Sequence, residues 1–189
     1  MSTDTKTTLL NSAERAARNL GFNGFSYADL AEDVGIRKAS IHHHFPSKAK
    51  LSVELMRRYH TTHEAACEDI SESISLGGAR MLALINLYRQ GLNGGKSLCL
   101  CVSFSTTREN LPPEVIQQIS AFRTMILDWL EMTFKAGQAD GSISGVSSPK
   151  TEAAAALALL EGGQLAARAE ENPDLFDNSI QLLIQRITV

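Results

Sequence analysis

The chain has 189 residues, of which 43% are hydrophobic and 21% are charged, and its formal net charge is −3. This composition is typical of a folded globular protein and excludes a disordered chain. No apolar run approaches the roughly 18 residues that a membrane span requires, and the first residues lack the apolar stretch of a secretory signal. Three cysteines without disulfide spacing fit a reducing compartment, so we expect a cytoplasmic protein with no membrane partner.

Charge is unevenly distributed along the chain. Residues 1–60 carry nine Lys or Arg against six Asp or Glu, whereas the remainder is acidic. Four of the basic residues fall between Arg37 and Lys50, a stretch without acidic residues that also holds three consecutive histidines. Such a segment is either a surface for a polyanion or a solvated charged face, and charge alone does not choose between the two.

Helical periodicity dominates from the first residues onward. Apolar residues at three- and four-residue spacings predict a helix over residues 5–20. Ser26 has the features of an N-cap for a short helix that ends at Gly35. A second short helix is expected over residues 37–44, and a long helix from residue 48 to about residue 70.

The two short helices, separated by one glycine-containing turn, predict a helix-turn-helix arrangement. Ala31 and Ile41 suit a close helix crossing, and Leu30, Ile36 and Phe45 are expected in the core. An ordinary helical hairpin is the alternative. The basic, hydroxyl and imidazole side chains of the second helix favour an outward helix that fits the major groove of DNA.

The rest of the chain also predicts helices, so the expected fold class is all-α. A short apolar stretch at 98–104 is compatible with a strand or a buried helix, and its helical neighbours favour a helix. Residues 137–147 are expected to form a flexible connector. The remaining predicted helices span residues 79–92, 113–136, 149–169 and 175–187.

The stretch 35–48, which reads GIRKASIHHHFPSK, resembles the TetR family of bacterial one-component transcription regulators. The resemblance extends over about the first 55 residues. It implies about nine helices, with a three-helix DNA-binding domain at 1–47 and a helical effector-binding and dimerisation domain at 48–189. The implied partners are double-stranded operator DNA, a small-molecule effector, and a second copy held through the last two helices.

The resemblance also assigns residues to the DNA interface. The groups implied to face the major groove are Arg37, Lys38, Ala39, Ser40, His42 and His43, whereas Ser26 and Tyr27 are implied to approach the flanking backbone and Lys48 to contact a phosphate. The sequence departs from the family at His42, where a tyrosine is usual, so binding is expected to become sensitive to pH. It also departs at Arg37, where a Ser or Thr cap is frequent.

An effector pocket is expected among aromatic and polar residues of the middle helices, although such a stripe also fits a plain core. A cation directed into an apolar cavity would select an anionic ligand, which makes Arg108 the most informative member. The candidates are Tyr88, Cys99, Phe104, Arg108, Phe122 and Trp129.

Two further clusters have alternative interpretations. Cys99 and Cys101 fall where one electrophile-sensing branch of the family has a reactive cysteine, which predicts either a redox-responsive regulator or two buried apolar thiols. His60, His63 and Cys67 share one helix face, with Glu64 nearby, as a partial metal site or an ordinary surface stripe. Because the set is incomplete, we expect no metal and no cofactor.

Together these features predict a regulator, most simply a repressor that an effector releases from its operator, and not an enzyme. The sequence has no glycine-rich phosphate loop and no nucleophile elbow. Small residues around Gly162-Gly163 and an apolar face over residues 175–187 favour a four-helix dimer interface, although that face also suits the monomer core. Ligand binding is expected to move the long helix that begins at Lys48. A helical module that binds an acidic protein partner is the alternative outside DNA binding.

Overall fold

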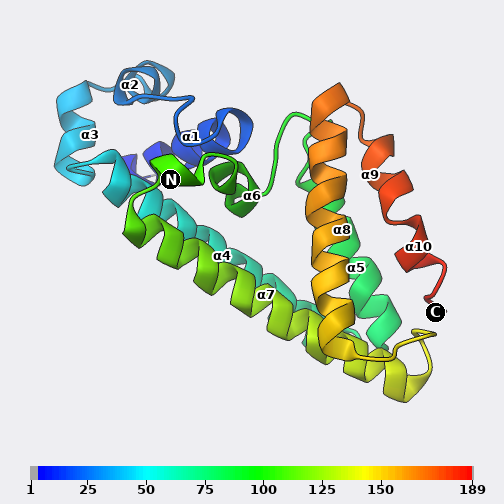
Figure 1. The fold of residues 1–189 in the computed structure, drawn as a ribbon. Coiled ribbons are helices and arrows are strands. Elements are labelled where there is room, and N and C mark those ends of the chain that lie inside the picture. The colour runs from blue at the N-terminus through cyan, green and yellow to red at the C-terminus, as the bar shows by residue number, and fades with distance from the viewer. Residues whose placement is uncertain (1–3, 189) are drawn as a thin grey trace. The chain divides into compact units, whose positions relative to one another are not determined.

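The computed structural model describes residues 4–188, which form ten α-helices, one 3₁₀ helix and no strand (Figure 1). The expected all-α fold class is therefore confirmed. In chain order the elements are α1 (Thr5–Leu20), α2 (Tyr27–Val34), α3 (Lys38–His44), α4 (Lys48–Ser73), α5 (Gly77–Gln90), α6 (Leu100–Ser105), η1 (Arg108–Asn110), α7 (Pro113–Asp140), α8 (Pro149–Glu170), α9 (Asp174–Ser179) and α10 (Gln181–Ile184). Among the described residues, no helix combines the length and the hydropathy that a bilayer span needs.

The chain packs as two compact units. The first holds residues 4–61 and 100–122, and the second holds residues 62–99 and 123–188, so α4 and α7 each contribute to both. The start of α4 and all of α6 therefore pack with α1–α3. The expected boundary after residue 47 separates a DNA-binding part from an effector-binding part, and it does not coincide with a boundary between these packing units. The functional division stays a prediction.

The core of the first unit joins the N-terminal helices to α6. Ala17 in the apolar stripe of α1 is fully buried, and its carbonyl accepts a 2.7 Å hydrogen bond from Ser103 Oγ of α6. Phe22, just after α1, meets Phe104 edge-on with ring centroids 5.8 Å apart. One polar and one aromatic contact thus fix α6 against α1.

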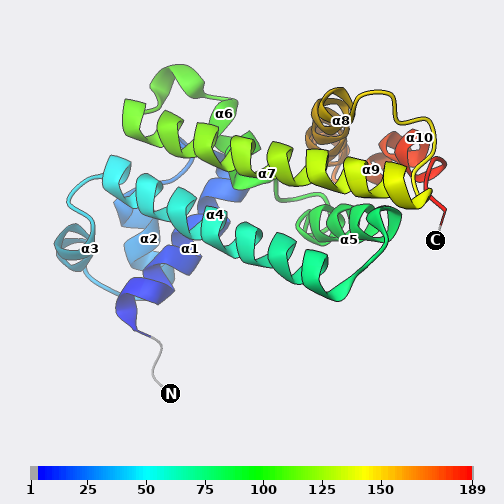
Figure 2. The same cartoon turned by 90° about the horizontal axis from the view of Figure 1, so that it is seen from below.

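The second unit includes the pair α8 and α9, which lie side by side in both ribbon views (Figures 1 and 2). Gly163 makes this approach possible, because a Cβ there would lie 2.3 Å from Ser179 Oγ and 3.0 Å from the Phe176 ring. A larger residue at 163 would push the two helices apart.

The segment after α7 differs from the expected flexible connector. The helix continues to Asp140, and the residues beyond it are bonded to the C-terminal segment. Ser144 N donates to Arg186 O at 2.8 Å, and Thr188 N donates to Ser142 O at 2.9 Å. Backbone pairing with a segment more than 40 residues away is a constraint that local sequence does not reveal.

The final helix also differs from the single one expected over residues 175–187. It divides at Ile180 into α9 and α10. A bond from Leu183 N to Ile180 O at 3.0 Å tightens the backbone, because it joins residues three positions apart instead of four.

Candidate nucleic-acid interface

Local capping fixes α2 at both ends. Ser26 Oγ accepts from the backbone N–H groups of Ala28 and Asp29, and Asp29 accepts from Ser26 N at 2.7 Å, which completes a capping box. Hydrogen bonds from Ser26 hold the pKa of the Asp29 carboxyl below its ordinary value. At the other end Gly35 adopts the left-handed conformation, with φ 72°, that glycine tolerates best.

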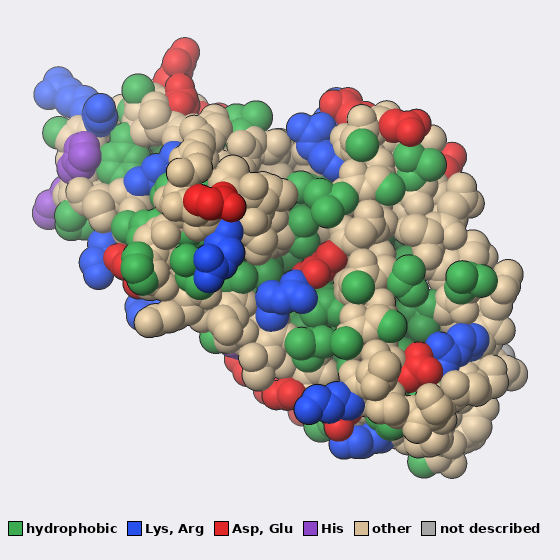
Figure 3. All heavy atoms as spheres, in the orientation of Figure 1, with side chains coloured by type: hydrophobic (Ala, Val, Ile, Leu, Met, Phe, Trp, Pro, Cys, Tyr) green, Lys and Arg blue, Asp and Glu red, His purple; other side chains and the backbone are tan. Residues whose placement is uncertain are grey.

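The helix α3 follows this turn and presents most of its side chains outward. Arg37 occupies its N-cap position without a side-chain cap bond, and Ile41 is the buried residue of the helix. Arg37 and Lys38 are exposed, and neither forms an ion pair within residues 4–188. Basic and histidine side chains gather at this end of the unit in Figure 3. The residues expected at the major groove that the structure places on this exposed surface are Arg37, Lys38, Ala39, Ser40, His42 and His43.

Tyr27 has a different position from the one expected for a DNA contact. Its side chain is 7% exposed, and its hydroxyl donates to the Phe45 carbonyl at 2.9 Å. Burial raises the pKa of this hydroxyl to about 12. The His42 ring meets the Tyr27 ring at a centroid distance of 4.9 Å. The Tyr27 side chain therefore joins α2 to the end of α3, and its approach to the flanking DNA backbone stays a prediction.

Lys48 likewise has neighbours that the sequence did not reveal. Its ammonium donates to the Phe25 carbonyl and lies over the rings of Phe25 and Phe22. The ammonium that was expected to contact a phosphate therefore already has partners within the protein. Periodicity gives no signal for a contact between residues 23 positions apart.

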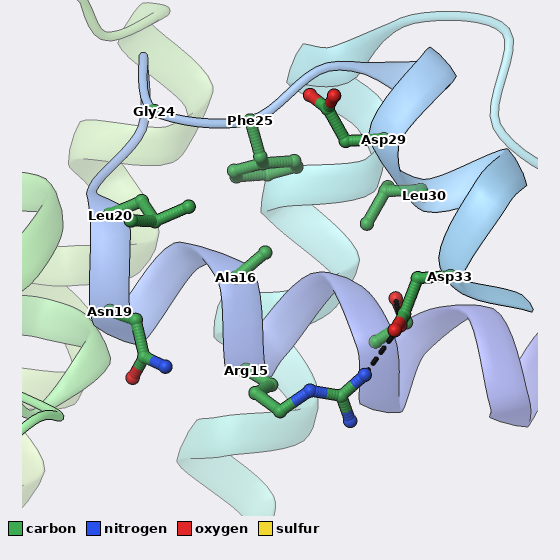
Figure 4. Close-up of a pocket in the computed structure, with 10 residues that line it drawn as sticks. Arg15, Ala16, Asn19, Leu20, Gly24, Phe25, Asp29, Leu30 and Asp33 are labelled. Carbon is green, nitrogen blue, oxygen red and sulfur yellow. Dashed lines mark hydrogen bonds and ion pairs between the residues drawn. The ribbon is translucent and has the colours of Figure 1, made fainter.

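A shallow pocket of about 260 Å³ lies between α1 and α2 on the same unit (Figure 4). Phe25, Leu30 and Ala16 give it an apolar lining, and the ion pair between Arg15 and Asp33 crosses one end. None of the expected DNA contacts lines it. The pocket is therefore separate from the exposed surface of α3.

The expected effector residues are divided between the two units. Phe104 and Phe122 are buried in the first unit, whereas Tyr88, Cys99 and Trp129 are buried in the second. Arg108 is exposed in η1, which corrects the expectation of a cation directed into an apolar cavity.

The buried aromatic side chains among these candidates have packing or hydrogen-bonding partners. The Phe122 ring centroid lies 5.3 Å from that of Tyr59. Trp129 Nε1 donates to Cys67 O at 3.0 Å and to Ser71 Oγ at 2.9 Å. These contacts favour the core interpretation for both residues.

An open groove of about 440 Å³ lies between α7 and α8 in the second unit. Its lining includes Leu127, Ala153 and Ala154 together with the carboxyl of Asp128 and the ammonium of Lys150. An apolar surface with a few polar groups in a volume of several hundred Å³ is typical of small-molecule sites. Sequence reasoning missed this groove because its two sides come from different helices, α7 and α8, whose packing periodicity does not encode.

The cysteines are buried. Cys99 and Cys101 are 2% and 0% exposed, an environment that favours apolar packing over reaction with an electrophile. Cys67 is also buried, which, with Glu64 nearby, raises the pKa of its thiol to about 12. Within the described residues, no group of three or more His, Cys, Asp or Glu is placed to hold a metal ion, so His60, His63 and Cys67 form no such site there.

The outer face of α8 is unusual because it is exposed yet almost free of charge along its middle turns. Gly162 has open space where a Cβ would stand, and Leu165 is 43% exposed. Leu182 of α10 is 72% exposed in the same unit. The exposed α8 residues with small or apolar side chains are Ala154, Ala155, Ala158, Gly162, Leu165 and Ala169. We call this set the α8 stripe.

Comparison with known proteins agrees with this geometry. Residues 9–55 match the family model described as bacterial regulatory proteins, tetR family. The HTH-type transcriptional regulator TtgR of Pseudomonas putida is 34% identical over 84 residues, which span 43% of this chain and 40% of TtgR. A TetR-family transcriptional regulator from Agrobacterium tumefaciens is 30% identical over 98% of both chains, with a TM-score of 0.92. A TetR regulator from Legionella pneumophila is 26% identical over 99% of both, with a TM-score of 0.87. The chain therefore belongs to the TetR family of transcriptional regulators.

Proposed function

We propose that the protein is a homodimeric, effector-responsive regulator that binds operator DNA through α3 and acts in the cytoplasm without catalysing a reaction. The observation that carries the proposal is the exposed surface of α3. Arg37 and Lys38 form no ion pair within the described chain, and α2, capped at both ends, buries Tyr27 and Leu30. An outward helix of this kind fits the major groove of duplex DNA. Ser26, exposed at the N-cap of α2, is proposed to approach the flanking DNA backbone.

Charge supports the assignment of α3 to DNA. The cationic side chains of Arg37 and Lys38 can donate hydrogen bonds to phosphates or to guanine edges, and Ser40 and His43 can form further hydrogen bonds with DNA. Because Ile41 faces inward, the residues on the opposite side of the helix face outward. The same surface would be a poor fit for an apolar protein partner.

The proposed dimer rests on the α8 stripe. Small residues let two helices approach closely, and exposed apolar area favours burial against a second copy. Two copies are also needed to place two α3 helices at half-sites about 34–36 Å apart. Leu182 extends the apolar surface onto α10.

The effector is proposed to bind the second unit, where the groove between α7 and α8 offers a site of suitable volume. Thr151 and Ala154 line the groove and are exposed on α8, so this side of the groove is open to a ligand from solvent. An effector that prefers the form with lower operator affinity would release the protein from DNA, because a ligand shifts the population toward the form it binds better.

A salt titration of DNA binding tests the proposal. The DNA upstream of the protein's own gene is compared with an unrelated duplex of equal length. We expect tighter binding to the upstream DNA at every salt concentration, and affinity that falls as salt rises because cations at α3 displace counterions. Equal affinity for the two duplexes across the titration would contradict an operator-binding function.

A further inference from the structure

We propose that Lys48 is a positioning residue for DNA binding, which holds the Phe25–Ser26 segment at the start of α2 instead of contacting a phosphate itself. This inference rests on the proposed DNA-binding function. Lys48 lies in the first turn of α4, and Ser26 is the N-cap of α2. The two are joined through Phe25 and Asp29.

The first connection is the environment of the Lys48 ammonium. Nζ donates a hydrogen bond to the Phe25 carbonyl. The same Nζ lies 4.1 Å from the centroid of the Phe25 ring and 5.0 Å from the centroid of the Phe22 ring. A cation over an aromatic face is attracted by the ring quadrupole, and the attraction grows as water is excluded. Lys48 is half-buried, so its charge is held by these groups more than by solvent.

The second connection runs through Asp29. Its carboxylate is attracted to the Lys48 ammonium and accepts from both Ser26 N, at 2.7 Å, and Ser26 Oγ, at 2.8 Å. Burial lowers the pKa of Lys48, and the charge of Asp29 opposes that shift. Removal of the ammonium would therefore release the Phe25 carbonyl, which directly precedes the Ser26 N-cap, and would take away a weaker attraction on the carboxylate that closes the capping box.

A phosphate contact is the competing role for Lys48, and it would require the ammonium to leave two rings and a carbonyl. Lys50 lies two residues further along α4, is exposed, and forms no ion pair among the described residues. Its ammonium can therefore contact a phosphate without giving up any contact inside the protein. The first turn of α4 thus holds one lysine turned to the protein and one available outside it.

Amide hydrogen exchange without DNA tests the positioning role directly. Lys48→Met keeps an unbranched stem against the rings but removes the charge. We expect exchange at Ala28 and Asp29, whose N–H groups bond Ser26 Oγ, to accelerate several-fold, while Ala17 in α1 keeps its protection. Lys50→Met is the matched control and should leave these amides unchanged. Unchanged exchange at Ala28 and Asp29 in Lys48→Met would overturn the proposal.

The salt dependence of operator binding separates positioning from direct contact. Removal of a phosphate contact lowers the slope of log affinity against log salt by about 1. Lys48→Met should instead weaken binding by a similar factor, roughly 5- to 20-fold, at every salt concentration with the slope unchanged. Lys48→Arg retains a cation that stacks on aromatic rings and should recover most of the affinity. Lys38→Met should lower the slope.

A slope that falls by about 1 in Lys48→Met would also overturn the proposal, because the lysine would then contact DNA. If Lys48→Met fails to fold, Phe25→Leu removes one ring, keeps the carbonyl, and should give the same exchange pattern in weaker form. Failure of the wild-type protein to prefer its upstream DNA would refute the proposed function, whereas the exchange measurement still decides whether Lys48 holds this segment.

Discussion

The exposed surface of α3 and the α8 stripe are both open to solvent, but they differ in chemistry. The first presents Arg37, Lys38, Ser40 and histidines around a single buried residue, whereas the second presents alanine, Gly162 and Leu165. Water solvates charged and hydrogen-bonding groups well, while exposed apolar area gains free energy on burial. This difference supports the proposal that the two surfaces bind different partners, a polyanion at α3 and an apolar face at the α8 stripe.

This difference also predicts how the two surfaces respond to conditions. Binding through cations weakens as salt rises, because salt competes for the phosphates. Association through small apolar side chains depends on area and close approach, and salt affects it little. Substitutions on the two helices should therefore separate dimerisation from DNA contact.

The largest expected effect comes from a carboxylate in the α8 stripe. A Cβ at Gly162 would have no atom within 4 Å, and Gly162→Glu also replaces a weak helix former. The monomer should fold, but a two-fold interface would bury two like charges. We expect sedimentation to show a monomer, and operator affinity to fall by roughly 100-fold or more because two-site binding is lost.

Ala139→Glu on α7 is a matched control, because it adds the same charge at an exposed position outside the stripe. It should sediment like the wild type. A Gly162→Glu variant that remains a dimer at micromolar concentration would show that the stripe is not the interface.

A smaller effect is expected from α3. Arg37→Ala should weaken operator binding by about 1–3 kcal/mol, because one cationic contact with DNA is lost while Ile41 continues to anchor the helix. Fluorescence anisotropy with labelled operator measures the change. Lys150→Ala removes an exposed cation from the second unit and should leave affinity unchanged. Equal losses in the two variants would point to net charge instead of a specific surface.

Local sequence predicted the fold well where single elements decide it. The capping box at Ser26 and the left-handed glycine at 35 follow from hydrogen-bond and steric rules within a few residues, so the boundaries of α2 could be predicted. The division of the last helix at Ile180 and the pairing of Ser144 with Arg186 could not, because they depend on contacts from distant segments.

In the candidate site, too, local features could be predicted from the sequence and contacts between distant segments could not. The outward face of α3 could be predicted from charge and from a single apolar residue, Ile41. The burial of Tyr27 and the aromatic environment of Lys48 depend on how α2 and α4 pack, which periodicity does not encode. Arg108 was misplaced for a related reason, since η1 directs it to solvent and nothing in its local sequence shows this.

A modest loss of stability is expected when the cap of α2 is removed. Ser26→Ala leaves the N–H groups of Ala28 and Asp29 without their acceptor, and should lower the free energy of unfolding by about 0.5–2 kcal/mol. Ser40→Ala on α3 is the control, because Ser40 is exposed and its hydroxyl forms no hydrogen bond within the described chain. Urea unfolding compares the two. Similar losses would show that the capping box contributes little, and would weaken the contrast between a helix fixed by its own caps and one left open for DNA.

The smallest expected effect is a pH dependence at Asp29. Its pKa is lowered in the folded protein, first by the hydrogen bonds from Ser26, so the ionised form stabilises the fold at pH values above the ordinary Asp pKa of about 3.9. That contribution is lost as pH falls from the ordinary pKa through the lowered folded pKa, because the unfolded chain takes up a proton at this carboxyl at a higher pH than the folded chain does. Asp29→Asn should therefore unfold at lower urea concentration than the wild type at pH 7, and the gap should narrow toward pH 3. The side chain is exposed, so salt should reduce the gap as well. A gap that stays constant from pH 7 to pH 3 would mean that the carboxylate charge does not contribute, and that the geometry of the cap alone holds the start of α2.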